Sequence, residues 1–150
     1  MIQRIQSVYL LVVTILMIVC LCLPLGSIVG SDNSISEFTN LCITTADGVK
    51  DYAPWALFVL LLLVAGLNFF AIFLFKKRML QIRLTIFSTI LLIGYYITLI
   101  SFAFLILPDD SSFSASWSVC LPFVAIILNW LAIRAIGADE ALVKAYDRLR

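Results

Sequence analysis

Four long apolar runs divide the chain, and they cover residues 7–23, 55–75, 84–107 and 117–136. Each run falls within the range of about 17–25 residues that lets an α-helix cross the hydrocarbon core of a bilayer. Helices are expected because a backbone in lipid must form its hydrogen bonds internally. The pattern therefore predicts an all-α fold, in which four transmembrane helices form a single domain over residues 1–150.

The first run also has the position of a signal peptide, because it follows Arg4 close to the start of the chain. It is longer than the usual signal core of about 7–15 residues, and the residues after Pro24 contain no pair of small residues at cleavage spacing. We therefore expect an uncleaved first helix.

The longest polar segment, residues 24–54, is rich in Ser, Thr, Asp and Asn. It predicts a larger outer loop between the first and second helices. Within it, residues 38–45 favour a strand, the pair Asp47 and Gly48 favours a tight turn, and residues 49–52 can form a second strand. A small β-hairpin is expected there.

Lys76, Lys77, Arg78 and Arg83 lie between the second and third runs, in a segment without acidic residues. Loops with this charge stay on the cytoplasmic side of a membrane. When the N-terminus and the tail are placed on the same side, every basic residue except Lys50 lies there, and most acidic residues lie on the other side. Both termini are therefore predicted to be cytoplasmic.

The tail, residues 137–150, differs in character from the run before it. Asp139 can cap a helix, and Glu140 and Lys144 have the i,i+4 spacing of a helical ion pair. Four apolar residues fall on one face: Leu142, Val143, Tyr146 and Leu149. We expect a short amphipathic C-terminal helix that lies at the cytoplasmic interface or docks a partner.

Composition narrows the class of protein. The 150 residues are 63% hydrophobic and 13% charged, with a net charge of +1 and a mean hydropathy of +1.13. Soluble domains are nearer half apolar and a quarter charged. The chain is therefore an integral membrane protein whose first partner is the lipid bilayer. Its charge balance excludes a broadly basic nucleic-acid surface.

The chain contains few side chains that could serve in catalysis. The chain has no histidine, and no Asp, Glu, Lys or Arg lies in the middle of an apolar run. Proton relays, ion couplers and many intramembrane enzymes need such groups. No glycine-rich phosphate loop or nucleophile elbow is present. We expect a protein that is not an enzyme, with no catalytic residue, metal site or cofactor.

Polar residues within the runs lie at a similar depth, about five to seven residues from the predicted cytoplasmic ends of their helices. They form one layer: Thr14, Asn68, Ser88, Thr89 and Asn129. Such groups either form hydrogen bonds across the bundle or line a path for a small solute. Both interpretations stay open from sequence.

All four cysteines, Cys20, Cys22, Cys42 and Cys120, are predicted to lie toward the oxidising outer side. A bridge from Cys42 to Cys120, or from Cys42 to Cys22, would tie the outer loop to the bundle. Connectivity cannot be derived from sequence, and free thiols packed as small apolar groups are the alternative.

The two ends of the chain carry motifs. The chain starts MIQRIQ, and its last twelve residues, which begin at Asp139, fit the pattern DExLVxxxDRxR. These motifs and the helix order resemble a family of small four-helix bacterial inner-membrane proteins, catalogued only as a domain of unknown function. The resemblance implies a bacterial inner (cytoplasmic) membrane location and no known activity, so no catalytic residue can be transferred.

We expect a structural or accessory subunit that binds other membrane proteins or a second copy of itself. The alternative is a small channel or transporter that forms when the bundle oligomerises around the polar layer. A third interpretation is a sensor of anionic lipid. The candidate contact residues at the cytoplasmic side are Lys76, Lys77, Arg78, Arg83, Asp139, Glu140, Arg148 and Arg150.

Overall fold

Helices dominate the computed structural model, which describes residues 2–52, 54–74, 76–106 and 112–149. Its long helices are α1 (Ile2–Cys22), α2 (Trp55–Phe73), α3 (Arg78–Ser101) and α4 (Cys120–Arg148). In sequence order they form a closed ring, because α1 packs on α2 and α4, and α3 packs on the same two helices. Four helices in the described part of the chain are long and apolar enough to cross a membrane, which confirms the predicted helical bundle.

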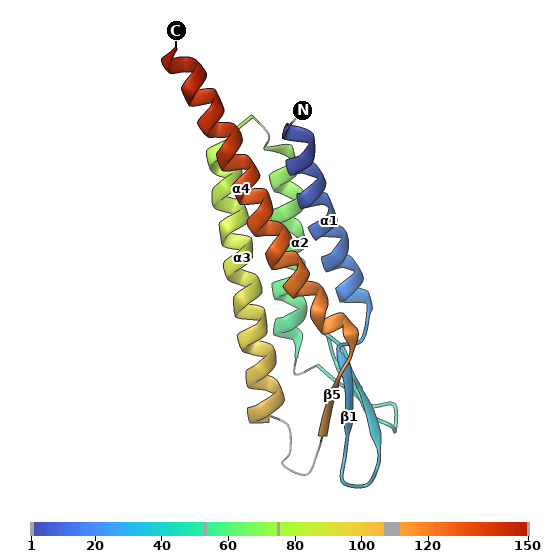
Figure 1. Cartoon of the computed structure of the whole chain (residues 1–150). Coiled ribbons are helices and arrows are strands. Elements are labelled where there is room, and N and C mark those ends of the chain that lie inside the picture. Colours follow the sequence, from blue (N-terminus) through green and yellow to red (C-terminus); the bar gives the residue numbers. More distant parts are fainter. Residues whose placement is uncertain (1, 53, 75, 107–111, 150) are drawn as a thin grey trace.

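The bundle has two different ends (Figure 1). The start of α1, the α2–α3 connection and the end of α4 lie together, and we call this the terminal end. All strands lie at the opposite end, which we call the sheet end.

Helix α3 starts earlier than the apolar pattern predicted. It begins at Arg78, so Arg78 and Arg83 are helix residues, and only Lys76 and Lys77 of the predicted basic loop precede the helix. At its other end α3 continues into one turn of π-helix, η1 (Phe102–Ile106). Residues 75 and 107, the predicted ends of the second and third runs, lie outside the described residues, as does Arg150.

Helix α4 corrects the prediction of a separate C-terminal helix. A 3₁₀ turn, η2 (Trp117–Val119), leads into α4, which then runs without a break through Gly137 and Asp139 to Arg148. A glycine inside a helix costs only about 1 kcal/mol, and the residues that follow Gly137 are mostly good helix formers. The last turns of α4 therefore extend beyond the other helices, and residues 141–149 are all exposed.

A five-stranded antiparallel sheet corrects the all-α prediction. Its order is β4-β3-β2-β1-β5, and the strands are β1 (Gly26–Val29), β2 (Ile35–Phe38), β3 (Ile43–Thr44), β4 (Lys50–Asp51) and β5 (Ser112–Ala115). The predicted hairpin is confirmed as β3 and β4, with Gly48 at φ +85° in the turn between them. The other three strands were not predicted.

Strand β5 joins two distant parts of the chain. It belongs to the α3–α4 connection, yet it pairs with β1 in the α1–α2 connection, with Gly26 opposite Ala115. A Cβ atom at Gly26 would overlap the carbonyl oxygen of Ser114, so the two backbones approach closely only because this residue is glycine. Phe38 of β2 anchors the sheet on the bundle, with ring centroids 5.5 Å from Phe102 and 5.6 Å from Phe113.

A buried amide holds the sheet to the helices. The side chain of Asn40, in the β2–β3 loop, is fully buried, and its Nδ2 donates to the carbonyl oxygen of Cys20 at 2.8 Å. The hydroxyl of Tyr95 donates to Asn40 Oδ1 at 2.7 Å. Asn40 therefore links the end of α1 to α3 near its sheet end.

We predict that Asn40 and Tyr95 are energetically coupled. In a double-mutant cycle, Asn40→Leu and Tyr95→Phe should show a coupling free energy of about 1 kcal/mol, because each change removes the partner of the other. Equilibrium unfolding in mixed detergent micelles measures it.

Tyr96→Phe is the matched control. The Tyr96 hydroxyl donates to the carbonyl oxygen of Val119 at 2.7 Å and not to Asn40. Its coupling to Asn40→Leu should be near zero. Equal coupling for the two tyrosines would contradict the assigned network.

Candidate functional site

The predicted polar layer contains a three-residue hydrogen-bonded cluster. Asn68 of α2 donates from Nδ2 to the Oγ of Ser88 on α3 at 2.9 Å, and Asn129 of α4 donates to the same oxygen at 3.3 Å. All three side chains are fully buried. The cluster joins three helices inside the bundle.

The two predicted threonines do not join this cluster. Thr14 Oγ1 donates to the carbonyl oxygen of Leu10 at 2.8 Å, and Thr89 Oγ1 donates to that of Thr85 at 2.9 Å. Both bonds stay within one helix, at the i−4 position. Thr14 and Thr89 are therefore satisfied locally and are not needed to hold helices together.

Sequence reasoning missed Gln81, which it assigned to the basic loop. Gln81 is buried, and its Nε2 donates to the carbonyl oxygen of Ala71 on α2 at 3.0 Å. A signal for it exists, because the buried residues of α3 recur at alternating spacings of four and three. They are Gln81, Thr85, Ser88, Leu92, Tyr95 and Leu99. This is the spacing of helices packed side by side.

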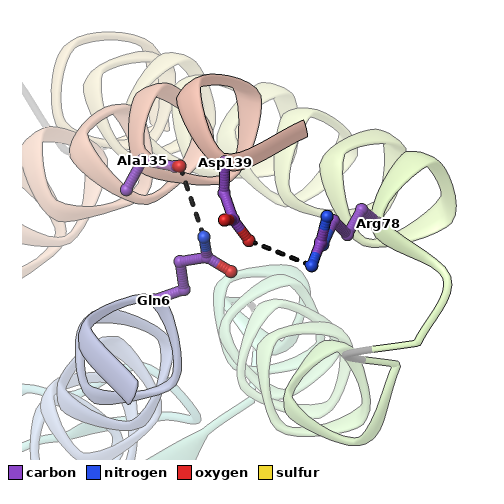
Figure 2. Close-up of polar contacts among 4 residues, drawn as sticks. All are labelled: Gln6, Arg78, Ala135 and Asp139. Carbon is purple, nitrogen blue, oxygen red and sulfur yellow. Dashed lines mark hydrogen bonds and ion pairs between the residues drawn. The ribbon is translucent and has the colours of Figure 1, made fainter. Parts of the chain in front are cut away.

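A second polar group lies at the terminal end (Figure 2). The buried Gln6 of α1 donates from Nε2 to the carbonyl oxygen of Ala135 on α4 at 3.3 Å. One turn further along α4, Asp139 Oδ2 lies 3.3 Å from a guanidinium nitrogen of Arg78. Figure 2 shows Asp139 pointing from α4 toward Gln6 and Arg78.

The Arg78–Asp139 pair is only partly exposed, at 22% and 13% of the two side chains. Charges shielded from water attract each other more strongly than charges on an open surface. Asp139 lies inside α4, so it does not cap a helix as the sequence had suggested, and it pairs with Arg78. It holds α4 against the start of α3, and with Gln6 it brings the two terminal motifs to the same end of the bundle.

A groove of about 580 Å³ opens beside this pair. It lies between the α2–α3 connection and the last turns of α4. Its lining residues are Lys76, Lys77, Arg78, Met79, Glu140, Val143 and Lys144. Glu140 and Lys144 form the predicted i,i+4 ion pair, with 3.6 Å between their charged atoms. Four of the predicted contact residues, Lys76, Lys77, Arg78 and Glu140, thus meet in one groove.

The other predicted contact residues lie apart. Arg83 and Arg148 are exposed and do not line the groove. Arg150 lies outside the described residues.

All four cysteines lie in the described part of the chain, and all are free thiols. The structure therefore contains neither a Cys42–Cys120 nor a Cys42–Cys22 bridge. Cys42 is buried, and its sulfur lies 3.7 Å from the hydroxyl of Thr39. Cys20 is also buried, with its sulfur 3.7 Å from the carbonyl oxygen of Ser118, whereas Cys22 and Cys120 are exposed.

Potential metal ligands do not cluster in the described residues, since no group of three or more Cys, Asp or Glu side chains comes together there. The polar groups that do gather are amides, hydroxyls, ammonium groups and one shielded ion pair. Such groups can bind a ligand or hold neighbouring helices in position. Those that line the groove are accessible to a ligand.

A comparison with protein families covers nearly the full length of the chain. A family with the description "Domain of unknown function (DUF4293)" matches residues 2–149. No curated protein matches the chain.

We predict that Ser88→Ala destabilises the bundle. The change removes the acceptor that Asn68 and Asn129 share, and the free energy of unfolding in mixed micelles should fall by about 1–2 kcal/mol. Thr89→Ala, the control on the same helix, should cost clearly less because its hydroxyl bonds only within α3. Similar losses for both would contradict a cross-helix role for Ser88.

We also predict that Arg78 and Asp139 are coupled. A cycle of Arg78→Gln with Asp139→Asn should give a coupling free energy of about 1 kcal/mol, since each change leaves a shielded charge without its partner. Replacing Arg78→Gln by Arg83→Gln should abolish the coupling. Coupling that is independent of which arginine is changed would show a general charge effect instead.

Proposed function

Because this chain belongs to the DUF4293 family, which has no assigned activity, we propose its function from its geometry. It is a non-enzymatic accessory subunit of the bacterial cytoplasmic membrane, and it binds another membrane protein through the projecting end of α4. The observation that carries this proposal is a helix-packing stripe on α4 that continues past the last helix able to cover it.

The stripe begins inside the bundle. The buried residues of α4 recur at spacings of three and four, and they are Pro122, Ala125, Asn129, Ala132 and Ile136. The same spacing continues through Asp139 to Val143 and Tyr146, which we call the α4 seam. Val143 is 41% exposed and Tyr146 is 77% exposed. A seam with this repeat is typical of packing against another helix.

A partner helix suits this seam better than a membrane surface does. An interfacial amphipathic helix lies in the plane of the membrane, whereas the end of α4 continues the direction of a bundle helix (Figure 1). At ~1.5 Å per residue, the exposed residues 141–149 extend roughly 13 Å. This length presents two to three helical turns to a partner.

The charge distribution supports a cytoplasmic terminal end. The exposed Lys76, Lys77, Arg83 and Arg148 lie there, while Lys50 lies in the sheet at the other end. Positive residues near transmembrane ends favour the cytoplasm. The α4 seam would then meet its partner on the cytoplasmic side, and the sheet would face the outside.

The geometry of the polar layer does not favour a channel. Asn68, Ser88 and Asn129 are buried within one bundle, so oligomerisation would leave them inside each protomer and away from a path between protomers. The alternative would be supported by solute flux in liposomes that Asn68→Leu together with Asn129→Leu abolishes.

We predict that the seam retains a stoichiometric companion. The tagged full chain, purified from its native membrane in mild detergent, should carry a membrane protein that Val143→Asn with Tyr146→Asn reduces at least tenfold. The pair changes no charge. Quantitative mass spectrometry of the purified material measures the loss.

Ala141→Asn with Ala145→Asn is the control, because it places the same side chains on the other face of the exposed turns. It should retain the companion. A photo-crosslinking residue at position 146 identifies the neighbour directly. A crosslinked product with twice the mass of the chain would show that the seam binds a second copy of this protein and not a different subunit. The absence of any companion at native expression would overturn the proposal.

A further inference from the structure

The groove at the terminal end has a marked excess of positive charge. Four of its lining residues are basic, Lys76, Lys77, Arg78 and Lys144, and Glu140 is the only acidic one. Even when Asp139 behind Arg78 is added, cations outnumber carboxylates. Lys77 is exposed and forms no ion pair with another described residue. The groove is therefore suited to an anion.

The start of α3 adds to this charge. Lys77 is the N-cap residue of this 24-residue helix, no side chain caps its first amides, and its first turn has no acidic residue. The positive end of the helix dipole thus lies at Arg78 and Met79, which both line the groove.

The position of the groove indicates the source of the anion. Helix α2 has 19 residues and a length of about 28 Å, close to the ~30 Å hydrocarbon core of a bilayer. Lys76 and Lys77 follow its end almost at once, so they lie at the level of the lipid headgroups. The groove also contains exposed apolar side chains, Met79 at 51% and Val143 at 41%. A free inorganic anion makes no use of such a surface, whereas a lipid does.

We propose that this groove is a binding site for an anionic phospholipid of the leaflet at the terminal end. The phosphate lies between Lys77, Lys76 and Lys144, and the glycerol and upper acyl chain contact Met79 and Val143. The phosphate contacts use none of the seam residues, whereas Val143 belongs to both the groove and the seam.

The test compares lipid retention by the full chain in detergent. Native mass spectrometry with added phosphatidylglycerol should show bound lipid, and phosphatidylcholine at the same concentration should bind at least tenfold more weakly. Lys76→Gln with Lys77→Gln should lower phosphatidylglycerol affinity about tenfold, which corresponds to about 1.4 kcal/mol. The thermal unfolding midpoint, measured with and without this lipid, provides a second readout and reports whether the variant is folded.

Arg83→Gln with Arg148→Gln is the control, because it removes the same charge at the same end but outside the groove. It should change the affinity less than twofold. Equal losses for the two pairs would show diffuse attraction and overturn the site. A further measurement adds inorganic phosphate alone. If phosphate raises the thermal unfolding midpoint as much as phosphatidylglycerol does, the ligand of the groove is a free anion and not a lipid.

The two proposals can fail separately. Loss of lipid binding in Lys76→Gln with Lys77→Gln leaves the α4 seam unchanged, so a retained companion would show that partner binding does not need the lipid. If Val143→Asn with Tyr146→Asn loses the companion but still binds phosphatidylglycerol, lipid binding does not need the partner.

Discussion

The hydrogen bonds of Asn40 hold the sheet against the helical bundle. A helix ends with carbonyl oxygens that have no partner in the helix, and in or near a bilayer water cannot be relied on to satisfy them. Asn40 donates to the carbonyl oxygen of Cys20 and accepts from the hydroxyl of Tyr95. One buried amide therefore provides a partner for a carbonyl at the end of α1 and also binds α3. The β2–β3 loop that carries Asn40 is thereby fixed, and the sheet takes its position on the bundle from it.

Contacts at the sheet end fix the position at which α4 enters the bundle. Ser118, just before α4, donates to the carbonyl of Pro24 at 2.5 Å, and β5 pairs with β1, so α4 starts from a fixed point. Further along, Ser88 accepts from Asn68 and Asn129, and the Arg78–Asp139 pair joins α4 to the start of α3. After Glu140, the described residues of α4 are all exposed. The exposed seam is what remains when a 29-residue helix crosses a bundle of shorter neighbours.

Local signals predicted much of this fold, and long-range contacts account for what they missed. The apolar runs identified the helices, and Asp47 with Gly48 identified the β3–β4 turn, since both depend on residues close in sequence. Strand β5 could not be predicted, because its pairing partner at Gly26 lies in another connection. Gly137 indicated a helix end, but α4 runs through it without a break. Of the site, the lysines were predicted from their charge, whereas the pairing of Arg78 with Asp139 required the packing of α4 against α3.

Val143 gives the two proposed surfaces a physical connection. It continues the 3-4 stripe of α4 and also lines the basic groove. A partner helix on the seam would cover one side of this residue, and a lipid chain in the groove would contact the other. Two ligands that share a side chain alter each other's affinity by the same factor, whichever binds first. The lipid would therefore act at the edge of the protein interface, and the composition of the membrane would influence how firmly the partner is held.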